Sequence, residues 1–428
     1  MTQKRKILIT AYAVNPYKGS EDGTGWNISY ELAKLNHVTV VTRKNNRPEI
    51  ERYFKENAGD PTLQDLNFMY YDLPKWLVFW KKKIGERGYV LYFYLWQLFM
   101  PLFIKTKGVR FDIAHALNFH SDSQPQFLWM LGKPVFWGPI GHHAPVPKEF
   151  ILKNHSRKDY LKDRLYNTVK WMFRNLDPFF YISKWTAKKI FVINSAINDS
   201  VKANPNKIKI IPAVATEEQP FIRPSFQSDF NLISVGRFTY MKGFDVVIDA
   251  FANFYSELNE TEQKRVKLKL VGKGEELENY QQMIKNHGLS DAIEIIKWVP
   301  KNEMPALYAA SSLFVFGSHE GAGMVVPEAL SFGLPIVCFD NNGPGELCSW
   351  DNALKIKYQS YDDSVYQFSK SISTLYKNHS LRENMSANAR HYSKSRFSWA
   401  NKAAQINEAY DAYELTKVKS HNLQKTTP

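Results

Sequence analysis

The chain has 428 residues, of which 44% are hydrophobic and 23% are charged, and its formal net charge is +14. This length exceeds one ordinary domain core and the composition is globular, so we expect two folded domains and exclude a fibrous or largely disordered chain. The only two cysteines, Cys338 and Cys348, argue against a disulfide framework and against a thiolate metal cage.

The positive charge lies in the first half. Through Ala215 there are 33 Lys and Arg against 17 Asp and Glu, a net +16, whereas the remainder has 23 against 25, a net −2. An anionic membrane surface is the partner we expect, because no helix-turn-helix, zinc-finger or RNP pattern points to nucleic acid; general solubility is the alternative. The opening residues do not read as a secretory signal, and the apolar run 89–104 is shorter than the roughly 20 residues that span a bilayer.

The first residues predict the start of a doubly wound α/β domain. Strand-like runs at 6–13 and 37–43 enclose a segment that is helical to about Leu35, preceded by G-S-E-D-G-T-G-W at 19–26. This segment lacks G-x-G-x-x-G, so a simple tight turn is an alternative to a ligand loop. Gly23 and Gly25 are its candidate ligand-contacting residues.

Residues 76–104 combine many aromatic side chains with Lys81, Lys82, Lys83 and Arg87. Such a mixture is typical of an element that lies in the headgroup layer of a membrane. A helical hairpin packed inside the first domain explains the same pattern equally well.

Four histidines follow. His115 ends the strand-like run 111–116, near the edge where open α/β sheets bind ligands, and His120 comes one loop later; a lone His is more often structural. His142 and His143 follow P-V-F-W-G-P-I-G and either line a site or fill space. No carboxylate or Cys at ligand spacing supports a metal there.

Residues 153–189 are basic and helical in tendency, 190–193 and 208–211 are strand-like, and 213–230 read as an interdomain linker. The second domain then starts with a strand at 231–235. Its loop 236–243, G-R-F-T-Y-M-K-G, presents Arg237 and Lys242, which suit a diphosphate.

The stretch 311–335 is where we expect the chemistry. A buried strand at 313–316 leads into a glycine loop and then a short helix that ends before Gly333. Backbone N–H groups at Gly321, Ala322 and Gly323 then favour a phosphate. Glu320 and Glu328 flank this loop; alone, they read equally well as a solvated loop residue and a first-turn acid.

The spacing Glu320-x7-Glu328, followed by E-A-L-S-F-G-L-P-I-V, resembles the signature of retaining glycosyltransferases of family 4. The resemblance covers most of the chain: G-S-E-D-G-T-G-W is similar to G-S-E-P-G-x-G-W of a bacterial subgroup, D-I-A-H to D-V-V-H, and 236–243 to G-R-x(n)-K-G. One departure is that His142 and His143 replace glycines of the subgroup's F-I-W-G-P-V-G-G-G.

The resemblance implies a GT-B architecture, two doubly wound Rossmann-like domains facing across a cleft. The expected boundaries are 1–215 for the acceptor side and 216–395 for the donor side, with a helix at about 396–416 packing back on the first domain and a disordered tail at 417–428.

The implied activity is transfer of a sugar, with retention, from a UDP- or GDP-sugar to a glycan or lipid-linked acceptor. The setting would be capsule, lipopolysaccharide or other cell-surface polysaccharide synthesis at the inner face of a bacterial membrane. Two rivals are a same-fold epimerase or phosphorylase, and a non-catalytic protein that binds glycan or lipid. No cofactor beyond the donor and no metal is expected, since the chain lacks Asp-x-Asp.

The resemblance also assigns roles to individual residues. The expected catalytic residues are Glu320, His115, Arg237 and Lys242; the donor-binding residues are Glu328, Gly321, Ala322, Gly323, Gly236, Gly272, Trp298 and Val299; the acceptor or diphosphate loops hold Gly23, Gly25, His120, His142 and His143.

Overall fold

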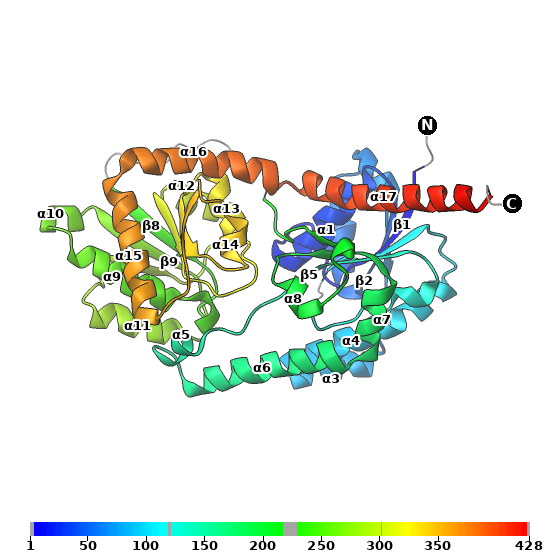
Figure 1. The fold of residues 1–428 in the computed structure, drawn as a ribbon, viewed down its shortest axis with the longest axis horizontal. Helices are drawn as coiled ribbons and strands as arrows, with labels where there is room; N and C mark the ends of the chain where they lie inside the picture. The colour runs from blue at the N-terminus through cyan, green and yellow to red at the C-terminus, as the bar shows by residue number, and fades with distance from the viewer. Residues whose placement is uncertain (1–3, 119–120, 217–228, 301, 426–428) are drawn as a thin grey trace. The chain divides into compact units, whose positions relative to one another are not determined.

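The computed structural model describes residues 4–118, 121–216, 229–300 and 302–425 (Figure 1). The chain forms two compact units. The first contains the described residues up to His142, residues 169–213 and those from Trp399 onward; the second contains 143–168 and 214–398.

The first unit is built on a seven-stranded sheet in the order β3-β2-β1-β4-β5-β6-β7, with parallel pairing throughout. Its strands are β1 (Lys6–Thr10), β2 (His37–Thr42), β3 (Leu66–Tyr70), β4 (Ile113–Ala116), β5 (Val135–Ile140), β6 (Ala187–Val192) and β7 (Ile208–Ile210). The predicted strands at 6–13, 37–43, 111–116, 190–193 and 208–211 are confirmed, whereas β3 and β5 were not predicted.

Helices cover both faces of this sheet. One face packs on α1 (Ser20–Ala33), α2 (Arg47–Glu56) and α17 (Trp399–Lys425), and the other on α4 (Glu86–Thr106), α7 (Pro178–Thr186) and α8 (Ile197–Val201). Helix α3 (Lys75–Ile84) lies against α4. Because helices cover both faces of the parallel sheet, nearly every residue of β1, β4 and β5 is buried, and β1 and β5 are mostly apolar.

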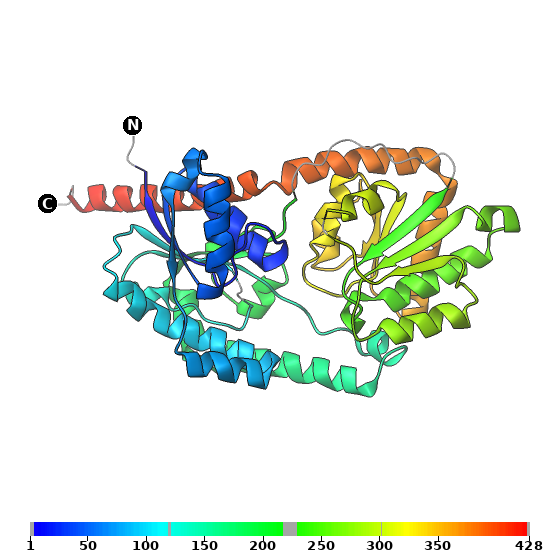
Figure 2. The same cartoon turned by 180° about the vertical axis from the view of Figure 1, so that it is seen from behind.

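The second unit repeats this plan with six parallel strands in the order β10-β9-β8-β11-β12-β13 (Figure 2). They are β8 (Phe230–Val235), β9 (Val266–Val271), β10 (Ile293–Ile296), β11 (Leu313–Phe316), β12 (Ile336–Phe339) and β13 (Ala353–Ile356). The two sheets confirm the predicted doubly wound α/β fold class.

Two helical layers enclose the second sheet. One contains α5 (Lys148–Leu152), α9 (Phe244–Ser256), α11 (Leu277–Asn286) and α15 (Tyr361–Lys377); the other contains α12 (Met304–Ala309), α13 (Val325–Ser331), α14 (Pro344–Leu347) and α16 (His379–Arg396). Short α10 (Glu260–Gln263) precedes β9.

Two predicted boundaries differ from the structure. Residues 143–168 belong to the second unit instead of the first, because Phe150 and Ile151 of α5 are buried in that unit's core. The helix α6 (Arg157–Leu176) continues through the unit boundary at residue 168. Helix α17 runs past the predicted end near residue 416 to Lys425, and most of the predicted linker 213–230 lies outside the described residues.

Residues 76–104 were expected either to face a membrane or to pack as a hairpin in the core, and the structure shows some of each feature. On α4, Tyr92, Phe93 and Trp96 are buried in the core, whereas α3 exposes Trp76 and its neighbours. Lys81 is not a surface cation as the sequence suggested: it is buried with its Nζ 4.2 Å from the ring centre of Tyr92. One face of this hairpin is therefore core, and the other faces solvent.

Candidate active site

The second sheet has a switch point between β8 and β11, because the chain progresses toward β10 on one side and toward β13 on the other. Ligands of open α/β sheets bind at the carboxyl ends of the strands that flank such a point. The loops at those two ends are 236–243 after β8 and 317–324 after β11. They contain four of the eight predicted donor-binding residues and three of the predicted catalytic residues, Arg237, Lys242 and Glu320.

The two loops touch through bare backbone. A Cβ on Gly243 would lie 1.9 Å from the carbonyl oxygen of Gly317, and one on Gly317 would lie 2.4 Å from that of Gly243. Gly243 also has φ +59°, a left-handed conformation that glycine adopts without strain. Only glycine fits both positions, so the sequence brings the two loops into direct contact.

Lys242 and Glu320 are the charged pair at this contact. The Lys242 Nζ lies 2.5 Å from Glu320 Oε1, and each side chain is about 15% exposed. A partly desolvated pair of this kind interacts more strongly than one on the open surface. The structure thus places together two residues that lie 78 positions apart in the sequence.

The other predicted donor residues differ in their exposure and contacts. Glu328, on α13, accepts a hydrogen bond from the hydroxyl of buried Tyr308 at 3.1 Å. Burial and then the nearby Glu328 raise the pKa of Tyr308 well above its usual value, so that hydroxyl remains a donor. Arg237 and Trp298 have exposed side chains, with Val299 next to Trp298 partly buried.

Glycine again allows close packing beside the first loop. A Cβ on Gly272, after β9, would lie 1.8 Å from the carbonyl oxygen of Gly236. Both are predicted donor-site residues. Gly272 does not tolerate a side chain without backbone movement, whereas a Cβ on Gly236 would make ordinary contacts, the nearest at 3.4 Å with the Lys242 side chain.

A third loop, after β12, completes the arrangement. The Asn341 amide donates to the carbonyl oxygen of Ser318 at 2.9 Å and accepts from the N–H groups of Gly343 and Gly345. A Cβ on Gly343 would lie 1.9 Å from the carbonyl oxygen of Glu320. Asn341 therefore fixes the backbone under Glu320, a role that the sequence did not reveal.

His143 also reaches this site. Its Nδ1 accepts a hydrogen bond from the N–H of Gly321 at 2.9 Å. The histidine is contributed by the segment that the structure assigns to the second unit. Gly321 was predicted to offer its N–H to a phosphate; in the structure that N–H is bound to His143, while Ala322 and Gly323 follow in the same loop.

In the first unit, the predicted glycine loop is already helical. Helix α1 begins at Ser20, so Gly23 and Gly25 lie in its first two turns. A Cβ on Gly25 would lie 2.0 Å from the carbonyl oxygen of Ala13. These glycines let α1 approach the loop after β1, and the loop itself is 11–19.

Asn118 secures that loop at the switch point between β1 and β4. Its side-chain amide donates to the carbonyl oxygens of Ala13, at 2.6 Å, and Glu21, at 3.0 Å. The residue was missed because an isolated Asn after a strand has no distinctive sequence pattern.

His115 has a structural environment, in contrast to the predicted contact with an acceptor. It is fully buried, and burial lowers its pKa to about 4, so the ring is neutral. The carbonyl oxygen of Gly138 can only accept, so Nε2–H donates to it at 2.8 Å and Nδ1 accepts from the Tyr410 hydroxyl at 2.5 Å. Both ring nitrogens are occupied by the protein.

His142 is held in a charged cluster at the end of β5. Its Nδ1 lies 2.6 Å from Asp122, which also pairs with Lys170 and Arg174 of α6. Burial alone would raise the pKa of Asp122, but hydrogen bonding and charge from His142 and Lys170 dominate and lower it well below its usual range. His120 lies outside the described residues.

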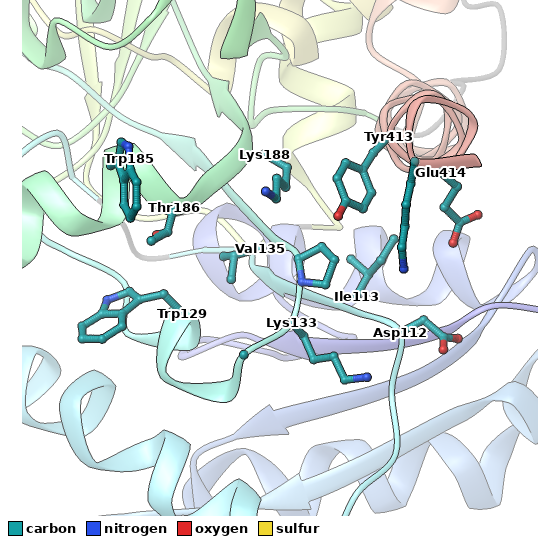
Figure 3. Close-up of a pocket in the computed structure, with 13 residues that line it drawn as sticks. Asp112, Ile113, Trp129, Lys133, Val135, Trp185, Thr186, Lys188, Tyr413 and Glu414 are labelled. Atoms are coloured by element: carbon teal, nitrogen blue, oxygen red, sulfur yellow. The ribbon is translucent and has the colours of Figure 1, made fainter. Parts of the chain in front are cut away.

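A hollow of about 850 Å³ lies elsewhere in the first unit. Figure 3 shows it between Trp129, Lys133, Trp185 and the α17 residues Tyr413 and Glu414. Asp112 and Thr186 directly precede β4 and β6, so this hollow is at the amino edge of the sheet. It is not at the edge where α/β sheets bind their substrates.

The sequence and the fold are both similar to those of known proteins. Residues 215–392 match the family model described as Glycosyl transferases group 1. The computed structure is similar to the crystal structure of Anabaena Alr3699/HepE in complex with UDP, with a TM-score of 0.60, 15% sequence identity, and coverage of 95% of this chain and 100% of that one. The fold is GT-B.

Two sequence relatives add to this result. An uncharacterized glycosyltransferase of Methanocaldococcus jannaschii is 25% identical over 322 residues, which are 74% of this chain and 78% of the relative. The amylovoran biosynthesis glycosyltransferase AmsD of Erwinia amylovora is 30% identical over 155 residues, which are 36% of this chain and 40% of that protein. Together with the family model, these matches support a glycosyltransferase with a GT-B fold. The residues that match the family model all belong to the second unit.

Proposed function

We propose that this GT-B protein transfers a sugar from a nucleoside-diphosphate sugar, UDP- or GDP-linked, to a glycan or lipid-linked acceptor, with retention of the anomeric configuration. The observation that carries the proposal is the Lys242–Glu320 pair, held at 2.5 Å where the loops after β8 and β11 meet. The family-4 assignment rests on the spacing of Glu320 and Glu328. The polysaccharide setting rests on the name of the Erwinia relative.

The chemistry requires charge stabilisation on the leaving diphosphate. As the bond between the anomeric carbon and the phosphate oxygen breaks, its electron pair goes to the diphosphate, and the acceptor oxygen forms the new bond. Lys242 and Arg237 supply the positive charge that stabilises the leaving oxygens. Glu320 orients the donor sugar, Glu328 binds the nucleoside, and the leaving phosphate accepts the acceptor's proton, so no protein base is required.

The proposal needs no metal, because the positive charges of Arg237 and Lys242 would do the work of a divalent ion. On the acceptor side, we retain the loop 11–19 and His142 as candidate contacts and assign His115 a structural role. The basic first half and the exposed side chains of α3 would hold the protein at the inner face of the cell membrane. Among the described residues, no helix has both the length and the apolar character needed to traverse a bilayer.

A panel of nucleotide sugars tests the donor proposal by thermal stabilisation, since a ligand that binds only the folded state raises its apparent stability. We expect one UDP- or GDP-sugar to stabilise the protein, and Lys242→Met to abolish the effect. Lys285→Met, which removes an exposed cation on α11, is the control and should behave like the wild type. The anomeric configuration of the product, read by NMR, and insensitivity to EDTA test retention and metal independence.

Other outcomes would favour the rivals. Donor turnover without an acceptor indicates an epimerase, and dependence on inorganic phosphate indicates a phosphorylase. If Glu320→Ala and Arg237→Ala leave the cellular role intact, the protein acts by binding and not by catalysis.

A further inference from the structure

Helix α6 buries its polar residues and exposes its apolar ones. At 3.6 residues per turn, positions 163, 167, 170 and 174 share one face. Asp163 and Lys170 are buried, and Asn167 and Arg174 are partly buried. Surface helices of globular proteins show the opposite arrangement, with apolar residues toward the core.

The buried polar face is paired inside the first unit. The Lys170 Nζ lies 2.8 Å from Asp122 Oδ1, and the Arg174 guanidinium contacts the same carboxylate. Just beyond the helix, Asp177 accepts a hydrogen bond from the Tyr94 hydroxyl of α4 at 2.9 Å. These contacts fix the rotation of α6 about its axis, so the opposite face must point outward.

That outward face is a continuous apolar stripe at i, i+4, i+8, i+11 and i+15. It consists of Leu161, Leu165, Val169, Met172 and Leu176, with exposed fractions between 41% and 65%. Large contiguous apolar surface is unusual on a soluble protein and indicates a binding face. We call this set of five residues the α6 stripe.

The exposed charged side chains of α6 itself are all positive, and one of them, Lys162, lies 3.9 Å from Glu275, an acid outside the helix. The exposed ionisable side chains of α6 are Arg157, Lys158 and Lys162, and its two acids, Asp159 and Asp163, are not exposed. A second copy of α6 would therefore bring no carboxylate to these cations, whereas an anionic lipid surface supplies the complementary charge.

The first unit exposes further aromatic side chains on α7 and α3. Trp185 of α7 is 80% exposed and Tyr181 is 47% exposed, and on α3 Trp76 is 62% and Trp80 50% exposed. The end of α6 lies beside α4, where Phe173 contacts Tyr94 (Figures 1 and 2). Trp and Tyr side chains collect at the headgroup level of membranes, where an apolar ring and a polar tip are both accommodated.

We propose that the α6 stripe is a membrane-docking face that lies in the headgroup layer of a bilayer rich in anionic lipid. This deepens the proposed function, on which the reason for docking rests, because a lipid-linked acceptor is found only at such a surface. It also identifies a docking element that the sequence pattern of residues 76–104 did not indicate. An interfacial helix with apolar residues on one side and cations at its margins binds a membrane through burial of the apolar side chains and through attraction of the cations to anionic lipids.

Vesicle flotation of the full chain tests the proposal. We expect binding to vesicles of phosphatidylcholine mixed with phosphatidylglycerol, and weak binding to phosphatidylcholine alone. Leu165→Gln/Met172→Gln/Leu176→Gln should reduce the vesicle partition coefficient by about tenfold or more, because several apolar side chains no longer leave water. Leu415→Gln is the matched control: Leu415 of α17 is 64% exposed and Leu176 is 65% exposed, yet only Leu176 belongs to the stripe.

A site-specific label locates the contact. Cys338 and Cys348 are both buried, so Met172→Cys can be labelled selectively with a nitrobenzoxadiazole dye, and Leu415→Cys serves as the control position. Anionic vesicles should shift the emission of the label at 172 to the blue and leave that at 415 unchanged. Flotation without a shift at 172 would overturn the proposal. A dimer in analytical ultracentrifugation that Leu176→Gln dissociates, with no effect of lipid, would show that a second copy covers the stripe and would likewise overturn it.

The docking result is separable from the donor result. The stripe variants should keep the thermal stabilisation by the nucleotide sugar, because none of their residues lies in the loops after β8 or β11. If no nucleotide sugar stabilises the protein while flotation still depends on the α6 stripe, the proposed function fails and the docking inference stands.

Discussion

Substituting His155 tests whether a buried ion pair attaches the segment 143–168 to the second unit. The His155 side chain is completely buried, with Nδ1 2.8 Å from Glu276 Oε2 and Nε2 3.6 Å from Asp245 Oδ1. Burial alone would lower the pKa of His155, but the two carboxylates outweigh burial and raise it from 6.5 to about 9. The ring is therefore cationic at neutral pH.

Because the pKa of His155 differs between the folded and unfolded states, this shift contributes to the free energy of unfolding. A change from 6.5 to about 9 corresponds to about 3 kcal/mol in the free energy of unfolding, at 1.36 kcal/mol per pH unit. Because the pKa is raised in the folded state, the contribution is complete below pH 6.5 and is lost as the pH rises through 9. The unfolding free energy contributed by this site should thus decline between those two values.

His155→Gln removes the cation and leaves Asp245 and Glu276 buried without it. We expect a loss of about 3–5 kcal/mol at pH 6, nearer the lower figure because the amide of Asn279 still donates to Glu276 at 2.9 Å. Near pH 9.5 the wild-type ring is itself mostly neutral, so the difference between the two proteins should shrink markedly. Urea titrations followed by circular dichroism across this range measure both effects.

His287→Gln is the control for this experiment. His287 also lies 2.8 Å from an aspartate, Asp249, but its side chain is 38% exposed, so its removal should cost no more than about 1 kcal/mol. A loss for His155→Gln that is the same at pH 6 and pH 9.5, or no loss at either, would refute the assignment of a buried cationic histidine.

Three further predictions concern the site and its support. Gly243→Ala should destabilise the second unit by about 2 kcal/mol or more, because its Cβ would lie 1.9 Å from the carbonyl oxygen of Gly317 and its φ is +59°. The control Gly288→Ala, at φ +68° but with open space around it, should cost only about 1 kcal/mol. Equal shifts in melting temperature for the two variants would mean that the close approach of the loops is unimportant. Tyr410→Phe should cost about 1–3 kcal/mol by leaving the buried His115 Nδ1 without its donor, with Tyr413→Phe as the neutral control on the same helix, and it should leave donor binding intact; loss of donor binding without a change in melting temperature would instead give His115 a functional role. Glu320→Gln should lower kcat by about 10²-fold or more with little change in unfolding free energy, and an unchanged kcat in a steady-state transfer assay would remove Glu320 from the mechanism.

The elements that the sequence predicted best are those whose signal is local. Residues 313–316 form a buried strand, as their apolar run predicted, and a loop with glycines follows them. Both signals lie within a few consecutive residues, so the sequence shows them directly. The same holds for Lys242 and Glu320, which were selected by the motifs around them. Strands β3 and β13 were missed because their runs are short and most of their residues are not fully buried.

Long-range contacts were beyond sequence reasoning. His143 binds a loop 178 positions away, and His155 pairs with a carboxylate 121 positions away. The local pattern of residues in the sequence does not predict such a pair. The predicted glycine loop at 19–26 became helix because Gly23 and Gly25 serve the packing of α1 on the β1 loop, a purpose that their spacing does not distinguish from ligand binding.

The sequence by itself determined the repeated α/β plan and the two charged loops, because hydrophobic periodicity and glycine placement act over a few residues. Only the tertiary structure decided that segment 143–168 belongs with the second unit, that His115 is sealed by Tyr410, and that α6 turns its apolar side outward. The physical reason is that burial and ion pairing depend on which distant groups surround a side chain. A leucine stripe has the same sequence whether it faces a core or a membrane, and the buried partners of Lys170 and Arg174 decide which.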